Sequence, residues 1–156
     1  MTITGIADEA SPELEGQIRA HRALGWDTLE LRLVGKTNVC ELDEPGFEQA
    51  RSALQEAGMG VICLASPIAN WSRPITADFS LDLQDLRRSI PRMHSLGASF
   101  LRVMSYPNDG LAERDWRAEA VRRMKQLAHI AASEGVVLLH ENCSGWGAAS
   151  AENQRI

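Results

Sequence analysis

The stretch SEGVVLLHEN (residues 133–142) carries the pattern that decides the fold. Its glycine, Gly135, follows a helical segment, where it can take the left-handed conformation that ends a helix at low steric cost. Four apolar residues come next, and their length and composition are typical of a strand that is covered on both faces. The strand then runs directly into His140 and Glu141, so ionisable groups stand at the end of a core element.

The same pattern occurs three more times, in ALGWDTLELRL, EAGMGVICLA and SLGASFLRVM. The four glycines lie about 33 to 39 residues apart, a period typical of a repeated structural unit. Residues 3–8 are a further apolar run without a helix before them, and they predict the first strand. Between the runs, apolar residues at helical spacing predict helices. The first helix is expected to start at Ser11 and Pro12. The helix expected over residues 44–57 has the weakest amphipathic pattern. Two stripes are clearest: Leu83, Leu86, Ile90 and Met93, and Trp116, Ala120, Met124, Leu127 and Ala131.

Five predicted strands therefore alternate with four predicted helices, and no hairpin is expected among them. Strict alternation implies right-handed crossovers and a parallel sheet, either open and doubly wound or part of a (β/α)8 barrel. Charged residues recur near the strand ends: Asp8, Glu30, Arg32, Arg102 and Glu141. Glu30 and Arg32 are two residues apart, so their side chains lie on the same face of the strand. Such charges are costly beneath covering helices, whereas the inner mouth of a barrel is open to water. The pattern favours an α/β fold with a parallel TIM-type barrel, truncated to about five strands, as a single domain over residues 1–156.

Composition excludes several classes of partner. The net charge of −5 argues against a protein that binds nucleic acid by neutralising phosphates, and against an anionic membrane surface. No run approaches the roughly 18 apolar residues of a membrane-spanning helix. The three cysteines are odd in number and lack paired spacing, so we expect reduced thiols in a soluble, cytoplasmic protein.

The loops after the predicted strands supply the candidate binding residues. Trp71 and Trp146 fall in such loops, where each could stack on a ligand or cover the end of the barrel. Arg32 could anchor a substrate, or it could pair internally with Glu30 or Asp8. Both pairs of alternatives stay open on the sequence alone.

Glu141 is the sharpest single candidate. A carboxylate at the end of a central strand can bind a divalent metal or act as a general base, or it can form a structural ion pair with Arg102. His140 points the opposite way along the strand, which favours packing or hydrogen bonding beneath a helix over metal binding.

Four segments together resemble the xylose isomerase-like barrel superfamily, and within it the sugar phosphate isomerase/epimerase proteins: GIADEA, LGWDTLELRL, LGASFLRVMSYP and VVLLHENCSGWG. The resemblance implies that Glu141 is both a metal ligand and the residue that exchanges a proton beside the substrate carbonyl. It also implies a divalent ion, commonly manganese, magnesium or cobalt, a sugar or sugar-phosphate substrate, and an enediolate intermediate.

The chain departs from that family in length. Such barrels run to about 250 residues or more, and the remaining metal ligands are carried by later strands, so this chain alone is expected to be inactive. A half-barrel that self-associates through exposed strand edges, or that binds a partner without catalysis, is the alternative. An endonuclease IV-like repair enzyme is less consistent with the negative net charge and the few histidines.

Overall fold

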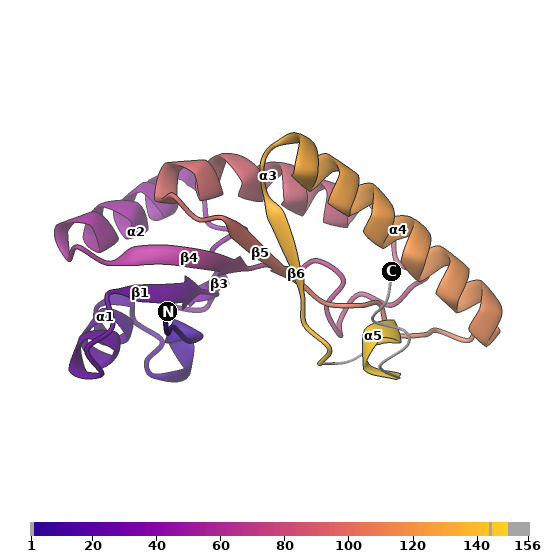
Figure 1. Cartoon of the computed structure of the whole chain (residues 1–156), viewed down its shortest axis with the longest axis horizontal. Helices are drawn as coiled ribbons and strands as arrows, with labels where there is room; N and C mark the ends of the chain where they lie inside the picture. Colours follow the sequence, from indigo (N-terminus) through magenta and orange to yellow (C-terminus); the bar gives the residue numbers. More distant parts are fainter. Residues whose placement is uncertain (1, 144, 150–156) are drawn as a thin grey trace.

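The computed structural model describes residues 2–143 and 145–149. Its main sheet has four parallel strands in the spatial order β1 (Thr28–Leu31), β4 (Gly60–Ala65), β5 (Phe100–Val103) and β6 (Val137–His140). The connecting helices are α2 (Glu44–Glu56), α3 (Ser80–Leu96) and α4 (Glu113–Ser133), while α1 (Leu14–Ala23) precedes β1. Figure 1 shows α2, α3 and α4 as an arc along one side of the curved sheet. The predicted alternation and the parallel sheet of a truncated barrel are confirmed.

The predicted first strand is reduced to a single parallel bridge between Ile6 and Glu30. The carbonyl of Gly5 accepts a hydrogen bond of 3.0 Å from the amide of Glu30. The short 3-10 helix η1 (Ala7–Glu9) then turns the chain away. The segment still lies beside β1, in the position expected of a first strand.

Two further features differ from expectation. A small antiparallel hairpin, β2 (Leu33–Val34) and β3 (Thr37–Asn38), follows β1, so the prediction that no hairpin occurs is wrong. Gly35, with φ of 63°, supplies the left-handed residue of its turn. Helix α1 begins at Leu14 instead of Pro12, and the Ser11 hydroxyl accepts a hydrogen bond from the amide of Glu13.

Strand register separates an inner face from an outer face. On the outer face, Leu31, Leu64 and Leu101 are fully buried and align across β1, β4 and β5. The predicted stripes of α3 and α4 lie in the same core, with Leu86, Met93 and Leu127 among its fully buried residues. Barrel architecture requires this division, since helices cover only the outside.

The inner face carries the charged residues. Glu30 aligns with Cys63, Cys63 with Phe100, and Phe100 with Val137, while Ala65, Arg102 and Leu139 form the next layer. Val137 and Leu139 are 50% and 42% exposed, since no described strand flanks β6 on its outer edge.

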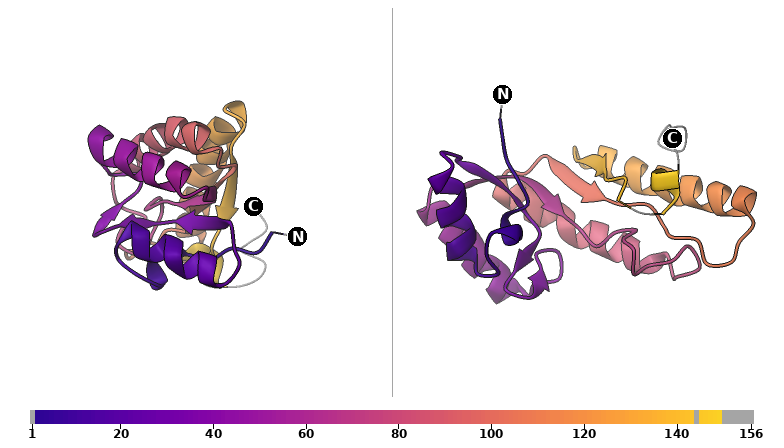
Figure 2. Two further views of the ribbon diagram at one scale, coloured as in Figure 1. Left: turned by 90° about the vertical axis from the view of Figure 1, so that its left-hand side faces the viewer. Right: turned by 90° about the horizontal axis from the view of Figure 1, so that it is seen from below.

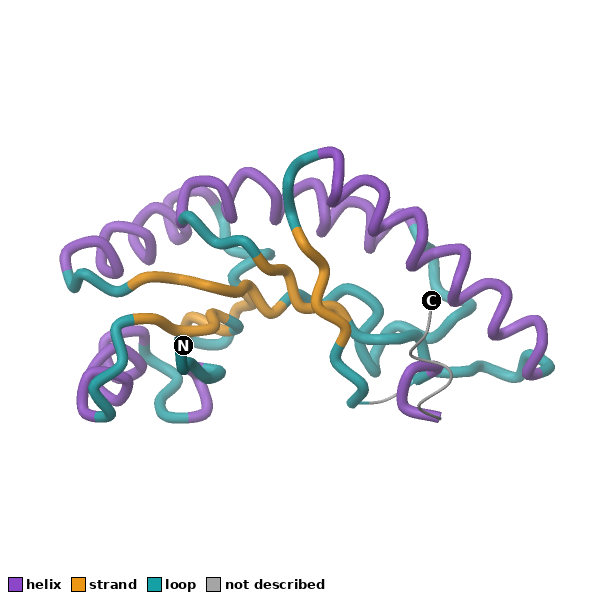
Figure 3. Tube along the Cα trace, in the orientation of Figure 1, coloured by secondary structure: helices purple, strands orange, loops and turns teal. Residues whose placement is uncertain are grey.

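The loops at the carboxyl ends of β4, β5 and β6 gather in one region of the molecule (Figure 3). The short helix α5 (Trp146–Ala149) follows β6 and packs against α4, beneath which it lies in Figure 1 and in front of which it lies in the view from below in Figure 2. Among the described residues, the helices are all too short or too polar to cross a membrane.

Candidate functional site

Five charged side chains meet on the inner face, from η1, from β1 and the residue after it, from β5, and from the residue after β6. We call them the charged cluster: Asp8, Glu30, Arg32, Arg102 and Glu141. The Nε atom of Arg32 lies 3.0 Å from Oδ2 of Asp8, and Nε of Arg102 lies 3.2 Å from Oε2 of Glu141. Glu30 interacts electrostatically with all four others. The convergence predicted from side-chain parity is therefore confirmed.

Glu30 is the half-buried centre of the charged cluster. Burial raises the pKa of its carboxyl above the ordinary value, although the positive charge of Arg102 acts in the opposite direction. The folded protein therefore disfavours the ionised form of Glu30 relative to the same group in water.

The ion pair weighed for Glu141 on sequence grounds is present. Arg102 is almost completely buried, whereas the side chain of Glu141 is 36% exposed. Nε of Arg102 makes no hydrogen bond among the described residues, so its contact with Glu141 is ionic. Glu141 is thereby held at the end of β6 with a carboxylate that remains open to solvent.

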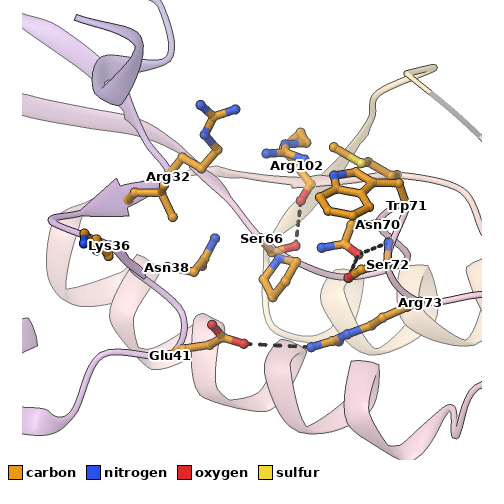
Figure 4. Close-up of a pocket in the computed structure, with 13 residues that line it drawn as sticks. Arg32, Lys36, Asn38, Glu41, Ser66, Asn70, Trp71, Ser72, Arg73 and Arg102 are labelled. Atoms are coloured by element: carbon orange, nitrogen blue, oxygen red, sulfur yellow. Dashed lines mark hydrogen bonds and ion pairs between the residues drawn. The ribbon is translucent and has the colours of Figure 1, made fainter. Parts of the chain in front are cut away.

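A cavity of about 410 Å³ opens at the carboxyl ends of the strands. Its lining includes Arg32 and Arg102 from the charged cluster, together with Lys36, Ser66, Asn70 and Trp71. Figure 4 shows Arg32 and Lys36 on one side, Trp71 on the other, and Arg102 between them. Cationic groups, hydrogen-bonding side chains and an aromatic ring therefore face one space.

The three residues predicted to bind substrate lie in three different environments in the structure. Trp71 is 70% exposed and lines the cavity. Arg32 also lines it, but its guanidinium is paired with Asp8 and Glu9. Trp146 is buried and packs edge-on against Trp116, with ring centroids 5.1 Å apart. Trp146 is not among the residues that line this cavity.

His140 lies beneath α5, as its parity predicted. Its Nε2 atom shares a hydrogen bond of 2.8 Å with Oγ of Ser105, and the Gly147 amide donates to the same oxygen. Burial lowers the pKa of the imidazole. This contact ties the segment after Glu141 to the loop after β5, and sequence reasoning missed Ser105 because the two segments are distant along the chain.

A buried network that sequence reasoning also missed holds the loop carrying Trp71. Arg73 Nη1 lies 2.7 Å from Oδ1 of Asp82 and 2.6 Å from Oδ2 of Asp85. The Tyr106 hydroxyl donates to Oδ2 of Asp82 at 2.7 Å, and burial raises the pKa of that hydroxyl. The sequence analysis placed Trp71 in a candidate binding loop, but the buried acids that fix this loop lie within the helical pattern of α3.

The described residues do not form a divalent-metal site by themselves. No three histidine, cysteine, aspartate or glutamate side chains gather suitably within residues 2–143 and 145–149. Glu141 is a single carboxylate already paired with Arg102, and one ligand is insufficient for a catalytic metal. A metal here would need donors from beyond these residues.

Comparison with known proteins gives a consistent picture. The family model "Xylose isomerase-like TIM barrel" matches residues 18–155, whereas no curated protein sequence matches. A xylose isomerase-like TIM barrel protein from Mycobacterium smegmatis, solved with magnesium, is 16% identical with a TM-score of 0.70, over 98% of this chain and 58% of that one. The 3-keto-D-glucoside 4-epimerase YcjR from E. coli is 15% identical with a TM-score of 0.64, over 90% and 56%.

The IOLI protein, solved with a zinc atom, is 13% identical with a TM-score of 0.65, over 90% of this chain and 51% of that one. At these identities the similarity concerns the fold. The chain spans between about half and three fifths of the length of these solved structures.

Proposed function

The chain belongs to the xylose isomerase-like TIM barrel family, and we propose that it forms part of a sugar isomerase or epimerase. The reaction removes a proton from a carbon beside the substrate carbonyl, moves the electron pair onto the carbonyl oxygen as an enediolate, and returns a proton to carbon. One observation carries this proposal. Glu141 presents a solvent-open carboxylate at the barrel mouth, beside a buried arginine that lines a cavity.

In this proposal Glu141 is the catalytic base and acid. A carboxylate within reach of the substrate carbon can accept the proton and return it. Arg102 adds preorganised N–H donors beside Glu141, where negative charge develops on the substrate oxygen. The charged cluster thus provides a proton acceptor and a group that stabilises the enediolate.

We further propose that Glu141 binds a divalent ion, manganese, magnesium or cobalt, together with ligands from outside this chain. Two solved relatives contain magnesium or zinc, which supports a metal in the family. The described residues provide only Glu141, so the chain alone is proposed to be inactive.

The proposed substrate is a sugar or sugar phosphate bound in the cavity. Trp71 offers an exposed aromatic face on which a sugar ring can stack, and Arg32 offers hydrogen-bond donors opposite it. Trp146 is buried against Trp116 and is left out of this proposal. A cytoplasmic location and the absence of nucleic-acid partners stay predictions.

A screen on the protein as its own cells make it tests this proposal. Intact mass spectrometry first establishes whether the product is close to 17.1 kDa or has the length of a whole barrel. Aldoses, ketoses and their phosphates are then offered with manganese, magnesium or cobalt, and isomerisation is followed by NMR. We expect a whole barrel to convert at least one sugar in a metal-dependent manner. A whole barrel that converts none of them contradicts the proposal.

A second candidate is a non-catalytic half-barrel that self-associates. The half-exposed Val137 and Leu139 on edge strand β6 favour it, since unpaired apolar edges promote pairing between chains. Sedimentation velocity of the chain and of Leu139→Lys tests it. A dimer that the substitution disperses supports this candidate, and a monomer at micromolar concentration contradicts it.

A further inference from the structure

We propose that the cavity beside the charged cluster binds an anionic oxygen group, a carboxylate or a phosphate, carried by the polyol substrate. This inference rests on the proposed sugar function and adds the charge of the ligand. Its basis is a set of cationic side chains that line the cavity and have N–H donors that make no hydrogen bond to the described residues.

Arg102 is the most buried of these cations. The residue is 7% exposed and lines the cavity, and among the described residues its one salt bridge within 4 Å is with Glu141, while Glu30 attracts it from farther away. No described acceptor receives a hydrogen bond from its guanidinium, and Nε is buried without one. A buried guanidinium is stable only when its donors are satisfied, so Arg102 has capacity for a further oxyanion.

Arg32 is fixed in place by its other partners. Its Nε donates to both oxygens of Asp8, and its Nη2 donates to Glu9 at 2.6 Å. Its Nη1 makes no hydrogen bond to the described residues, and the side chain faces the cavity (Figure 4). An arginine already held by carboxylates loses little conformational freedom when it binds a ligand with its remaining edge.

Lys36 adds a charge that the described protein does not neutralise. It stands in the turn between β2 and β3, is exposed, and forms no ion pair with the described residues. The cavity lining as a whole has four cationic residues and one acid, Glu41, in a chain whose net charge is −5.

Glu41 does not cancel these donors. It interacts with Arg73, whose Nη2 lies 4.0 Å from its Oε1, away from Arg32 and Lys36 (Figure 4). Serine and asparagine side chains would be sufficient for neutral hydroxyl groups, and they are also present. Three cations with open donors are better matched by a carboxylate or phosphate, which accepts several charge-assisted hydrogen bonds at once.

Calorimetric titration of the 156-residue chain tests the inference, with glucose as the neutral probe, glucuronate as the carboxylate and glucose 6-phosphate as the phosphate. We expect at least one anionic sugar to bind about tenfold or more tightly than glucose, with an advantage that falls as salt is raised. The tighter of the two anions identifies the group. Equal affinity for all three overturns the inference and leaves the proposed sugar function standing. Absence of binding by all three overturns the inference, whereas the sugar function, which is assigned to the whole barrel, is decided by the metal-dependent screen described above.

A matched pair of variants localises the charge effect. Lys36→Gln and Lys125→Gln each remove one exposed positive charge, the first at the cavity and the second on α4. We expect Lys36→Gln to weaken the anionic sugar by about three- to tenfold while glucose is unaffected, and Lys125→Gln to change neither. Identical behaviour of the two variants overturns the assignment of this cavity.

Discussion

Arg102 on β5 and Glu141 at the end of β6 meet on the inner face of the sheet, with Nε and Oε2 3.2 Å apart. The pair is asymmetric, since the guanidinium side chain is 8% exposed and the carboxylate side chain 36%. Arg102 also attracts Glu30 on the far side, so one buried cation serves two carboxylates. The shared cation allows two acids to lie near each other at the barrel mouth.

Replacement of this cation is expected to destabilise the fold. Arg102→Met leaves Glu30 and Glu141 without their common partner, and we expect a loss of about 1–3 kcal/mol in the free energy of unfolding, reduced by the exposure of Glu141. Urea denaturation measures it. Arg102→Lys keeps the charge and should lose less. Equal losses in the two variants would show that side-chain packing, and not charge, determines the effect.

The raised pKa of Glu30 predicts a pH dependence of stability. The pKa of Glu30 is higher in the folded state than in the unfolded state. The contribution of Glu30 to the free energy of unfolding is therefore fully present below its unfolded-state pKa and is lost as pH rises through its folded-state pKa. Glu30→Gln mimics the neutral acid, so the variant should lose less stability than wild type between pH 4 and pH 8, a range that begins below the ordinary glutamate pKa. Urea denaturation at both values measures this, with Glu134→Gln as an exposed control. Parallel pH profiles for wild type and Glu30→Gln contradict the prediction.

Much of this architecture follows from local sequence. Glycines that end helices, together with the parity of Glu30, Arg32 and Arg102, predicted the parallel strands and their charged inner face, since both signals act within a few residues. The β2–β3 hairpin was missed because strands of two residues carry no periodic signal. The predicted first strand is only a single bridge in the structure, because η1 turns the chain at Ala7.

The site was less predictable, since its contacts are long-range. Two alternatives were open for Trp146 on the sequence alone, and its contact with Trp116 on α4 could not be foreseen because the two residues are far apart along the chain. Lys36 lies in a loop after a predicted strand, where binding residues were expected. Its place in the lining of the cavity becomes visible only in the folded structure. Arg73 is held by ion pairs with Asp82 and Asp85, and in the sequence these two acids look like ordinary helix residues.

The Asp82 network predicts a graded loss of stability. Tyr106→Phe removes one donor while Arg73 remains, and we expect a loss of about 1–2 kcal/mol. Asp82→Ala leaves Tyr106 without its acceptor and Arg73 with Asp85 as its remaining close partner, and we expect about 2–4 kcal/mol. Chemical denaturation of both variants gives the two values. Equal losses would contradict a network centred on Asp82.

Close packing of α5 makes Gly147 intolerant of a side chain. A Cβ atom there would lie 2.0 Å from Cε1 of His140 and 2.7 Å from Oγ of Ser105. Gly147→Ala should therefore displace α5 and separate Trp146 from Trp116, which near-ultraviolet circular dichroism detects as a loss of the coupled indole signal. Ala148→Ser, at an exposed position, is the control. An unchanged spectrum for Gly147→Ala contradicts the packing of α5 described above.

Solvent proton exchange at the substrate carbon tests the central claim, the catalytic role of Glu141, most directly. The protein as its own cells produce it is incubated in deuterium oxide with a sugar that it converts, and NMR follows deuterium at the carbon beside the carbonyl. We predict exchange with wild type and with Glu134→Gln, and a loss of at least about a hundredfold with Glu141→Gln, because the variant lacks the group that accepts the proton. Exchange at the wild-type rate by folded Glu141→Gln would contradict the role assigned to Glu141.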